Sequence, residues 1–153
     1  MVLAQESYIE TINAYTKQQW KPLLELIPFI ENAANFGEFE EGQTIADGIH
    51  TFPYWTLSDV VSKFIKIVYE IPVIIDFDWG SWGEGSRIAK DIGFNYGNID
   101  IPTKCKLLTA FVRNDRFCEG ALVEVFESGL MLKILKSIEN QLGPGINDLS
   151  TGL

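Results

Sequence analysis

The sequence predicts a compact, mostly α-helical domain of about six helices, interrupted by one long acidic loop. Apolar residues recur at helical spacing over most of the 153-residue chain. Prolines and glycines stand where helices would begin or end, and only between residues 35 and 54 does the helical pattern disappear. The length fits one domain, which we place at residues 1–142, followed by a frayed C-terminal tail at 143–153.

The first third of the chain predicts two helices. Tyr8, Ile12 and Tyr15 recur at helical spacing and define the apolar face of the first one. Pro22 is compatible with the first turn of a second helix, where a missing N–H leaves no hydrogen bond unmade. Pro28 lies within the continuing apolar pattern, so we expect it to kink or split that helix.

The stretch NFGEFEEGQTIADGIHTFPY, at residues 35–54, predicts an acidic loop. Three glycines and four acidic residues break any amphipathic pattern there. The loop has room for one short β-hairpin. A loop of this length in a small domain is either mobile or functional, and the sequence leaves both readings open.

Residues 56–71 give the clearest helical pattern in the chain. Thr56 can cap this helix, with Asp59 three residues later, and the apolar positions that follow trace one continuous face. Pro72 ends the helix, because the residue before a proline resists the α conformation. The run at 73–75 that follows can form a short buried strand or a helical turn.

The last third of the chain is predicted to be helical from residue 103 to residue 141. Asp100 and Pro102 are typical of a helix start. Gly120 and Gly129 then divide the apolar pattern into shorter faces, so we expect breaks at both positions.

The charge of the chain excludes some classes of partner. The net charge is −9, and residues 1–50 contribute −6 of it, from eight acidic and two basic residues. Such a chain would be repelled by phosphate backbones and by anionic membranes, so we expect no nucleic-acid or membrane binding. The sequence contains neither an apolar run of about 20 residues nor a secretory leader, which predicts a soluble, cytoplasmic protein.

Two sequence elements resemble a known family. They are Phe77-Asp78-Trp79-x-x-Trp82 and Arg113-x-x-Arg116-Phe117-x-x-Gly120. Over roughly residues 50–140 the chain is similar to a family of small uncharacterised prokaryotic proteins, described as a domain of unknown function. The resemblance implies a mostly helical domain and implies no activity, ligand or partner.

The same two elements supply the candidate site. Arg113 and Arg116 share one helical face, and a buried guanidinium needs carboxylate or carbonyl partners. We therefore expect the arginines to bind the Asp76 to Trp79 segment as an internal clasp, in which case Arg116→Ala would strongly destabilise the fold. The alternatives are an anion or ligand site and an exposed pair of arginines without a role. The candidate ligand-binding residues are Asp76, Asp78, Trp79, Trp82, Arg113, Arg116, Phe117 and Glu119.

The sequence contains no recognisable catalytic motif. A phosphate-binding loop, a dinucleotide fingerprint, a nucleophile elbow and a zinc-protease helix are all missing. Two cysteines and one histidine also argue against a Cys/His zinc site. We assign no catalytic residue, metal or cofactor and expect a non-enzymatic helical module that binds itself or another protein. The alternative is a small-molecule or anion-binding domain, with or without weak hydrolase chemistry, at the Asp/Trp/Arg cluster.

Overall fold

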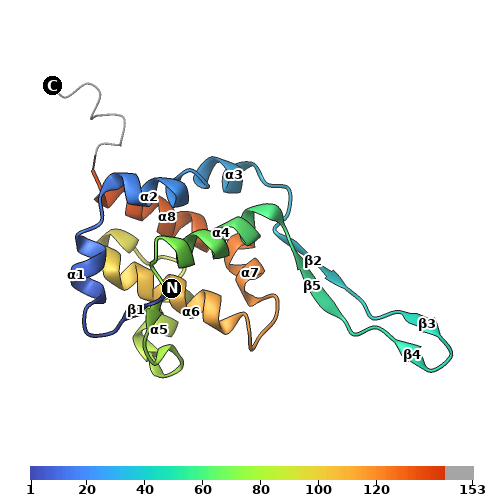
Figure 1. Ribbon diagram of the computed structural model, residues 1–153. Coiled ribbons are helices and arrows are strands. Elements are labelled where there is room, and N and C mark those ends of the chain that lie inside the picture. The colour runs from blue at the N-terminus through green and yellow to red at the C-terminus, as the bar shows by residue number, and fades with distance from the viewer. Residues whose placement is uncertain (144–153) are drawn as a thin grey trace.

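The computed structural model describes residues 1–143 and shows a helical body from which a β-ribbon projects (Figure 1). The predicted mostly helical class is confirmed. The helices are α1 (Tyr8–Asn13), α2 (Lys17–Leu24), α3 (Ile27–Asn32), α4 (Asp59–Glu70), α5 (Gly83–Lys90), α6 (Ile101–Asn114), α7 (Ala121–Glu127) and α8 (Leu130–Gln141), with short 3₁₀ turns η1 (Trp79–Ser81) and η2 (Tyr96–Asn98). No helix within the described residues is both long and apolar enough to cross a bilayer. The predicted frayed tail lies, from residue 144 on, outside them.

The N-terminal helices are shorter than the periodicity predicts. A capping box divides α1 from α2, because Thr16 accepts a hydrogen bond from the Gln19 amide and donates its own amide to the Gln19 side chain. Pro22 lies inside α2 rather than in its first turn. Pro28 occupies the first turn of α3, and the apolar pattern is divided there into α2 and α3, so the predicted split is observed and the kink is not.

Helix α4 begins two residues later than the sequence predicts. Ser58 stands at its N-cap, and Thr56 belongs to the strand before it. The correction has a simple cause, because Thr56 pairs with Glu38 across a β-ladder and cannot also cap a helix. The helix start predicted at Asp100 is confirmed, since Asp100 stands at the N-cap of α6 and accepts a hydrogen bond from the Thr103 amide. The break predicted at Gly120 is also confirmed.

Helix α6 lies at the centre of the body, and nearly all of the buried apolar side chains form one cluster around it (Figure 1). A short parallel pair joins β1 (Leu3–Ala4) to β6 (Ile75–Asp76). The Ile75 amide donates to the Thr109 hydroxyl at 3.0 Å, which ties β6 to α6. The segment after β6 is thereby positioned beside α6.

Residues 37–57 form a two-stranded ribbon that we call the arm. β2 (Gly37–Glu40) pairs with β5 (Tyr54–Leu57), and farther out β3 (Thr44–Ala46) pairs with β4 (Ile49–His50), all antiparallel. The chain reverses at Asp47 and Gly48, and Gly48 has a φ of 77°. The predicted hairpin is therefore present, but it occupies the whole predicted loop and extends away from the body (Figure 1).

A buried lysine joins three elements of the body. The Lys104 side chain is fully buried in α6 and donates to the Gln141 side-chain oxygen in α8. The Gln141 amide donates in turn to the carbonyl oxygens of Gly97 and Ile99, at 3.3 and 2.9 Å. Burial lowers the pKa of Lys104 to about 8, although the Asp100 carboxylate opposes part of this shift.

This lowered pKa predicts a pH-dependent stability difference between the native protein and Lys104→Met. Below pH 8 the lysine is charged in both the folded and the unfolded chain, so the folded state carries the full cost of a buried charge. Between pH 8 and about 10.4 the unfolded chain binds more protons, so stability rises with pH. Urea unfolding at pH 7 and 10.5 should show the native protein gaining roughly 1–3 kcal/mol relative to the variant. A difference that does not change with pH would contradict the assignment.

Candidate functional site: the arm and the adjoining groove

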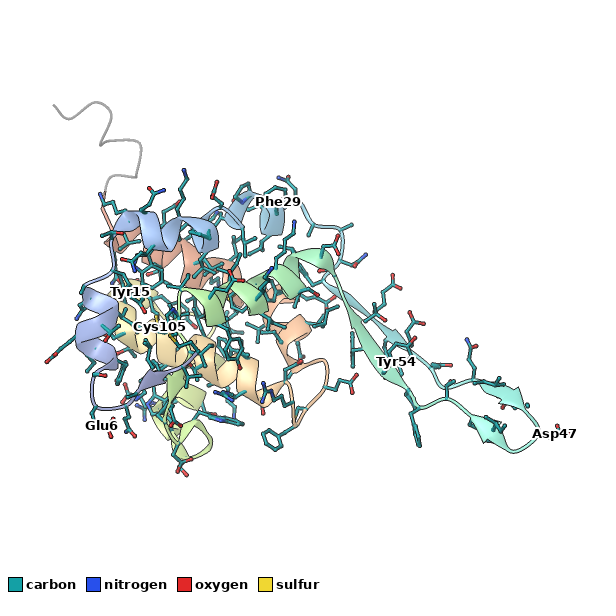
Figure 2. All side chains as sticks on the ribbon, viewed as in Figure 1. Glu6, Tyr15, Phe29, Asp47, Tyr54 and Cys105 are labelled. Carbon is teal, nitrogen blue, oxygen red and sulfur yellow. The ribbon has the colours of Figure 1, made fainter. Side chains whose placement is uncertain are left out.

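The arm carries apolar side chains that contact solvent instead of the body. Phe52 is 87% exposed and Ile45 is 67% exposed. Figure 2 shows side chains standing out from both sides of the ribbon, with Asp47 at its far end. The large apolar residues exposed on the arm are Phe39, Ile45, Ile49, Phe52 and Tyr54.

The two faces of the inner ladder differ in chemistry. Phe39 pairs with Trp55 on one face, with ring centroids 5.7 Å apart. Glu38 and Glu40 alternate with it and lie on the other face, and Glu40 pairs with Tyr54. Residues 35–57 contain four acidic residues and no lysine or arginine, a net charge of −4. The arm therefore combines exposed aromatic groups with negative charge.

The root of the arm is held by the turn between α6 and α7. The Trp55 amide donates to the Glu119 carboxylate at 2.6 Å. The Trp55 indole lies so close to the Gly120 backbone that a Cβ at residue 120 would overlap it. On the other strand, a Cβ at residue 37 would lie 2.8 Å from the Val123 side chain in α7. The arm thus joins the body through close contacts at two glycines.

The turn that receives the arm has a defined conformation of its own. Gly120 has a φ of 93°, a left-handed conformation that glycine adopts without steric cost. The Asp115 carboxylate accepts hydrogen bonds from the Gly120 amide at 3.2 Å and the Leu122 amide at 3.0 Å. This carboxylate satisfies amides at the start of α7 and so fixes the turn beneath the Trp55 indole.

The arginine clasp expected from the sequence is not formed by ion pairs. Arg113 is half-buried, and its guanidinium lies 5.9 Å from the centre of the Tyr69 ring in α4. Arg116, Asp76 and Asp78 are exposed. Within residues 1–143 the ion pairs join Lys66 to Glu70 and Lys136 to Glu31, and neither arginine takes part. Exposed charges gain little by pairing, because water solvates each of them well.

Aromatic contacts bring the two predicted elements together instead. The Trp79 and Phe117 rings are 5.9 Å apart, although Phe117 is 78% exposed. The Trp82 ring meets Phe77 edge to face at 5.6 Å, and the Lys106 ammonium lies 4.4 Å from the Trp82 ring. Lys106 is a site residue that the sequence reasoning missed.

A groove of about 950 Å³ opens beside these aromatic residues, between η1, α5, α6, α7 and the start of α8. Its aromatic lining residues are Trp79, Trp82 and Phe111. Small residues make up much of the remaining surface, namely Gly80, Gly83, Gly85, Ser86, Ala89 and Ala110. Lys90 and Glu124 are its charged lining residues. Of the eight predicted site residues, Trp79 and Trp82 line the groove, Phe117 packs on Trp79, and Glu119 lies at the arm root instead.

Two findings concern metal binding and thiol chemistry in the described chain. No group of three or more His, Cys, Asp or Glu side chains within residues 1–143 could hold a metal ion. Burial raises the pKa of the Cys105 thiol, so this thiol stays protonated and unreactive at neutral pH.

The exposed residues of the arm were also missed, although the sequence contains a signal for them. Asp47-Gly48 is a common two-residue hairpin turn, and apolar residues flank it at Ile45 and Ile49. Phe39 alternates with Glu38 and Glu40, which is the spacing of a strand.

The Gly120 contact predicts a larger loss of stability than backbone conformation alone would cause. Gly129 has a similar φ of 86°, but a Cβ there would meet nothing within 4 Å. Gly129→Ala should therefore cost about 1–2 kcal/mol, for the left-handed conformation alone. Gly120→Ala should cost at least about 1 kcal/mol more, because the Trp55 indole must also move. Chemical denaturation measures both, and equal losses would contradict the proposed anchoring contact.

Because Arg116 forms no ion pair with another described residue, we no longer expect its substitution to destabilise the fold. Because the side chain is exposed, Arg116→Ala should change the free energy of unfolding by no more than about 0.5 kcal/mol. Thermal and urea unfolding of the variant test this, with Asp115→Ala as the comparison. Loss of the Asp115 carboxylate should cost about 1 kcal/mol or more, since it leaves two amides without an acceptor. Strong destabilisation by Arg116→Ala would contradict this expectation and support the clasp hypothesis.

Comparison with known proteins identifies a family and no function. The model of a family of unknown function, DUF6508, matches residues 15–143. Searches of curated proteins and of solved structures gave no match. The family match spans α2 to α8 and includes both the arm and the groove. By this match, the chain belongs to the DUF6508 family of unknown function.

Proposed function

We propose that this chain is a non-enzymatic protein-interaction module that binds its partner through the arm. The observation that carries the proposal is the exposure of Phe39, Phe52 and Tyr54, with Ile45 and Ile49, on a ribbon that projects from the body. Several large apolar side chains left in solvent on one acidic ribbon are typical of an interaction site.

The energetics of a two-stranded ribbon support the same proposal. An isolated ribbon is marginally stable in water, because each strand has a neighbour on one side only. Its outer edges keep unpaired amide and carbonyl groups that a partner can use. Burial of apolar area stabilises a complex by roughly 25 cal/mol per Å², so covering the arm residues is favourable.

The anchored root reduces the entropic cost of binding. The Glu119 carboxylate and the Gly120 backbone hold Trp55 in place before any partner arrives. A preorganised binding element loses less conformational freedom when it binds. The net charge of −4 on residues 35–57 favours a neutral or cationic partner surface.

A second candidate function is supported by the groove. Its volume of about 950 Å³ and its two tryptophans are suited to a small organic molecule. Such a ligand would be recognised at Trp79 and Trp82 and would not involve the far end of the arm. Substitutions on the arm therefore distinguish the two candidates, because they would leave small-molecule binding unchanged.

The arm proposal predicts that partner binding depends on exposed apolar residues that the fold does not need. Ile45→Ser/Phe52→Ser should reduce the affinity for a partner at least tenfold, because these side chains supply buried area only in the complex. The partner is first captured from source cells by the native chain. It is then purified and titrated against the native chain and the variant by calorimetry.

The matched control is Phe29→Ser, which removes a side chain that is also exposed but lies in α3, away from the arm (Figure 2). We expect this control to bind like the native chain. Equal binding by all three proteins, or a greater loss in the control, would contradict a role for the arm. Circular dichroism spectra should be the same for all three, since neither substituted surface belongs to the core.

A further inference from the structure

We infer that the partner of the arm is a second copy of the chain, and that the groove of each copy receives the arm of the other. This inference rests on the proposed function and names the partner and the surface that receives the arm. It is carried by the shape of the groove, the direction of the arm, the charges of both surfaces and the position of α7.

The groove has the shape to accept large side chains. Gly83, Ser86, Ala89 and Ala110 project little or no side chain into it, which leaves space beside the Trp79 and Trp82 rings. The arm offers side chains of the complementary size, and Phe52 is the most exposed of them. Large groups on one surface and small groups on the other allow close packing when the two meet.

The arm of a given copy cannot reach its own groove. Its root is fixed at Gly37 and Trp55 by contacts with Val123 and Gly120. From there the ribbon extends away from α5 and α6, and Asp47 lies at the end farthest from the body (Figures 1 and 2). Only the groove of another molecule is therefore available to the distal residues.

Charge favours contact between arm and groove over contact between two arms. Two arms side by side would bring together two segments of net charge −4. At the groove, Lys90 lines the wall and the Lys106 ammonium lies over the Trp82 ring. Glu124 is the one acidic lining residue in the described chain. Opposite charges across an interface favour this orientation and speed encounter.

Helix α7 places the two surfaces next to each other. Val123 of α7 contacts the root of the arm, whereas Ala121, Glu124 and Val125 line the groove. The arm therefore leaves the body beside the groove, and two copies related by a twofold axis could each extend the distal part of the arm to the groove of the other. Such an arrangement is closed and uses each contact twice.

The experiment measures the mass of purified full-length chains by sedimentation velocity at increasing concentration. The native chain and Phe29→Ser should form dimers with the same affinity. The arm variant Ile45→Ser/Phe52→Ser and the groove variant Gly83→Glu/Ser86→Glu should each lose at least tenfold in dimer affinity. The groove substitutions are at exposed positions, and a Cβ at residue 83 would meet nothing within 4 Å, so the body should stay folded.

Mixing the two defective variants gives the decisive result. The arm variant keeps an intact groove, and the groove variant keeps an intact arm, so one native contact can form between them. We expect a mixed dimer that binds more tightly than either variant binds itself. Raising the salt concentration should weaken the native dimer, because the acidic arm meets basic residues.

Three outcomes would overturn the inference. They are a native chain that is monomeric at every concentration, a dimer that the groove variant forms as well as the native chain, and a mixture with no association beyond that of its components. The first of these leaves the proposed function intact if an arm-dependent heterologous partner is found. The proposed function fails separately, when arm substitutions affect neither self-association nor binding of another protein.

Discussion

The packing of the Trp55 indole on the Gly120 backbone is the contact on which the arrangement of the arm depends. It requires a glycine, both for the φ of 93° and for the space that a Cβ would occupy. Two carboxylates reinforce it. The Asp115 carboxylate accepts a hydrogen bond from the Gly120 amide, and the Glu119 carboxylate accepts one from the Trp55 amide. Without this contact the ribbon would meet the body only through Gly37 and the strand ends.

Helix α7 connects the two proposed binding surfaces to the core. Leu122 and Phe126 are buried in the apolar cluster, and Phe126 meets the rings of Phe36 and Phe64 at 5.4 and 5.3 Å. The same helix contacts the arm through Val123 and lines the groove through Val125. A shift of α7 would therefore move the arm and reshape the groove together, so the two surfaces keep a fixed relation.

The sequence predicted the helical elements better than the site. Asp100, Pro102 and Gly120 are local signals, and they correctly mark the starts of α6 and α7, although α6 begins at Ile101 and not at residue 103. The predicted start of α4 was wrong because Thr56 pairs with Glu38 in a β-ladder, and the residues next to Thr56 in the sequence do not reveal this pairing. The arm extended beyond the predicted hairpin for the same reason, since a ribbon is defined by its register rather than by its composition.

The site reasoning identified two neighbouring elements and misjudged what joins them. Trp79 and Phe117 do come together, but as rings 5.9 Å apart rather than through Arg116 and a carboxylate. Helical spacing placed the two arginines on one face, yet it could not show that Arg113 points to Tyr69 while Arg116 remains in water. The groove was beyond sequence reasoning, because its small residues come from separate elements that only tertiary packing assembles.

Hydrogen exchange of residues 37–57, followed at low and high protein concentration, tests the central claim most directly. The amides of β2 and β5 should be protected at both concentrations, because the root is anchored within one chain. The amides around Ile45 and Phe52, together with the groove residues of α5, should gain protection only at high concentration, where copies meet. Uniformly rapid exchange along the arm at both concentrations would contradict both the anchored root and the exchange of arms.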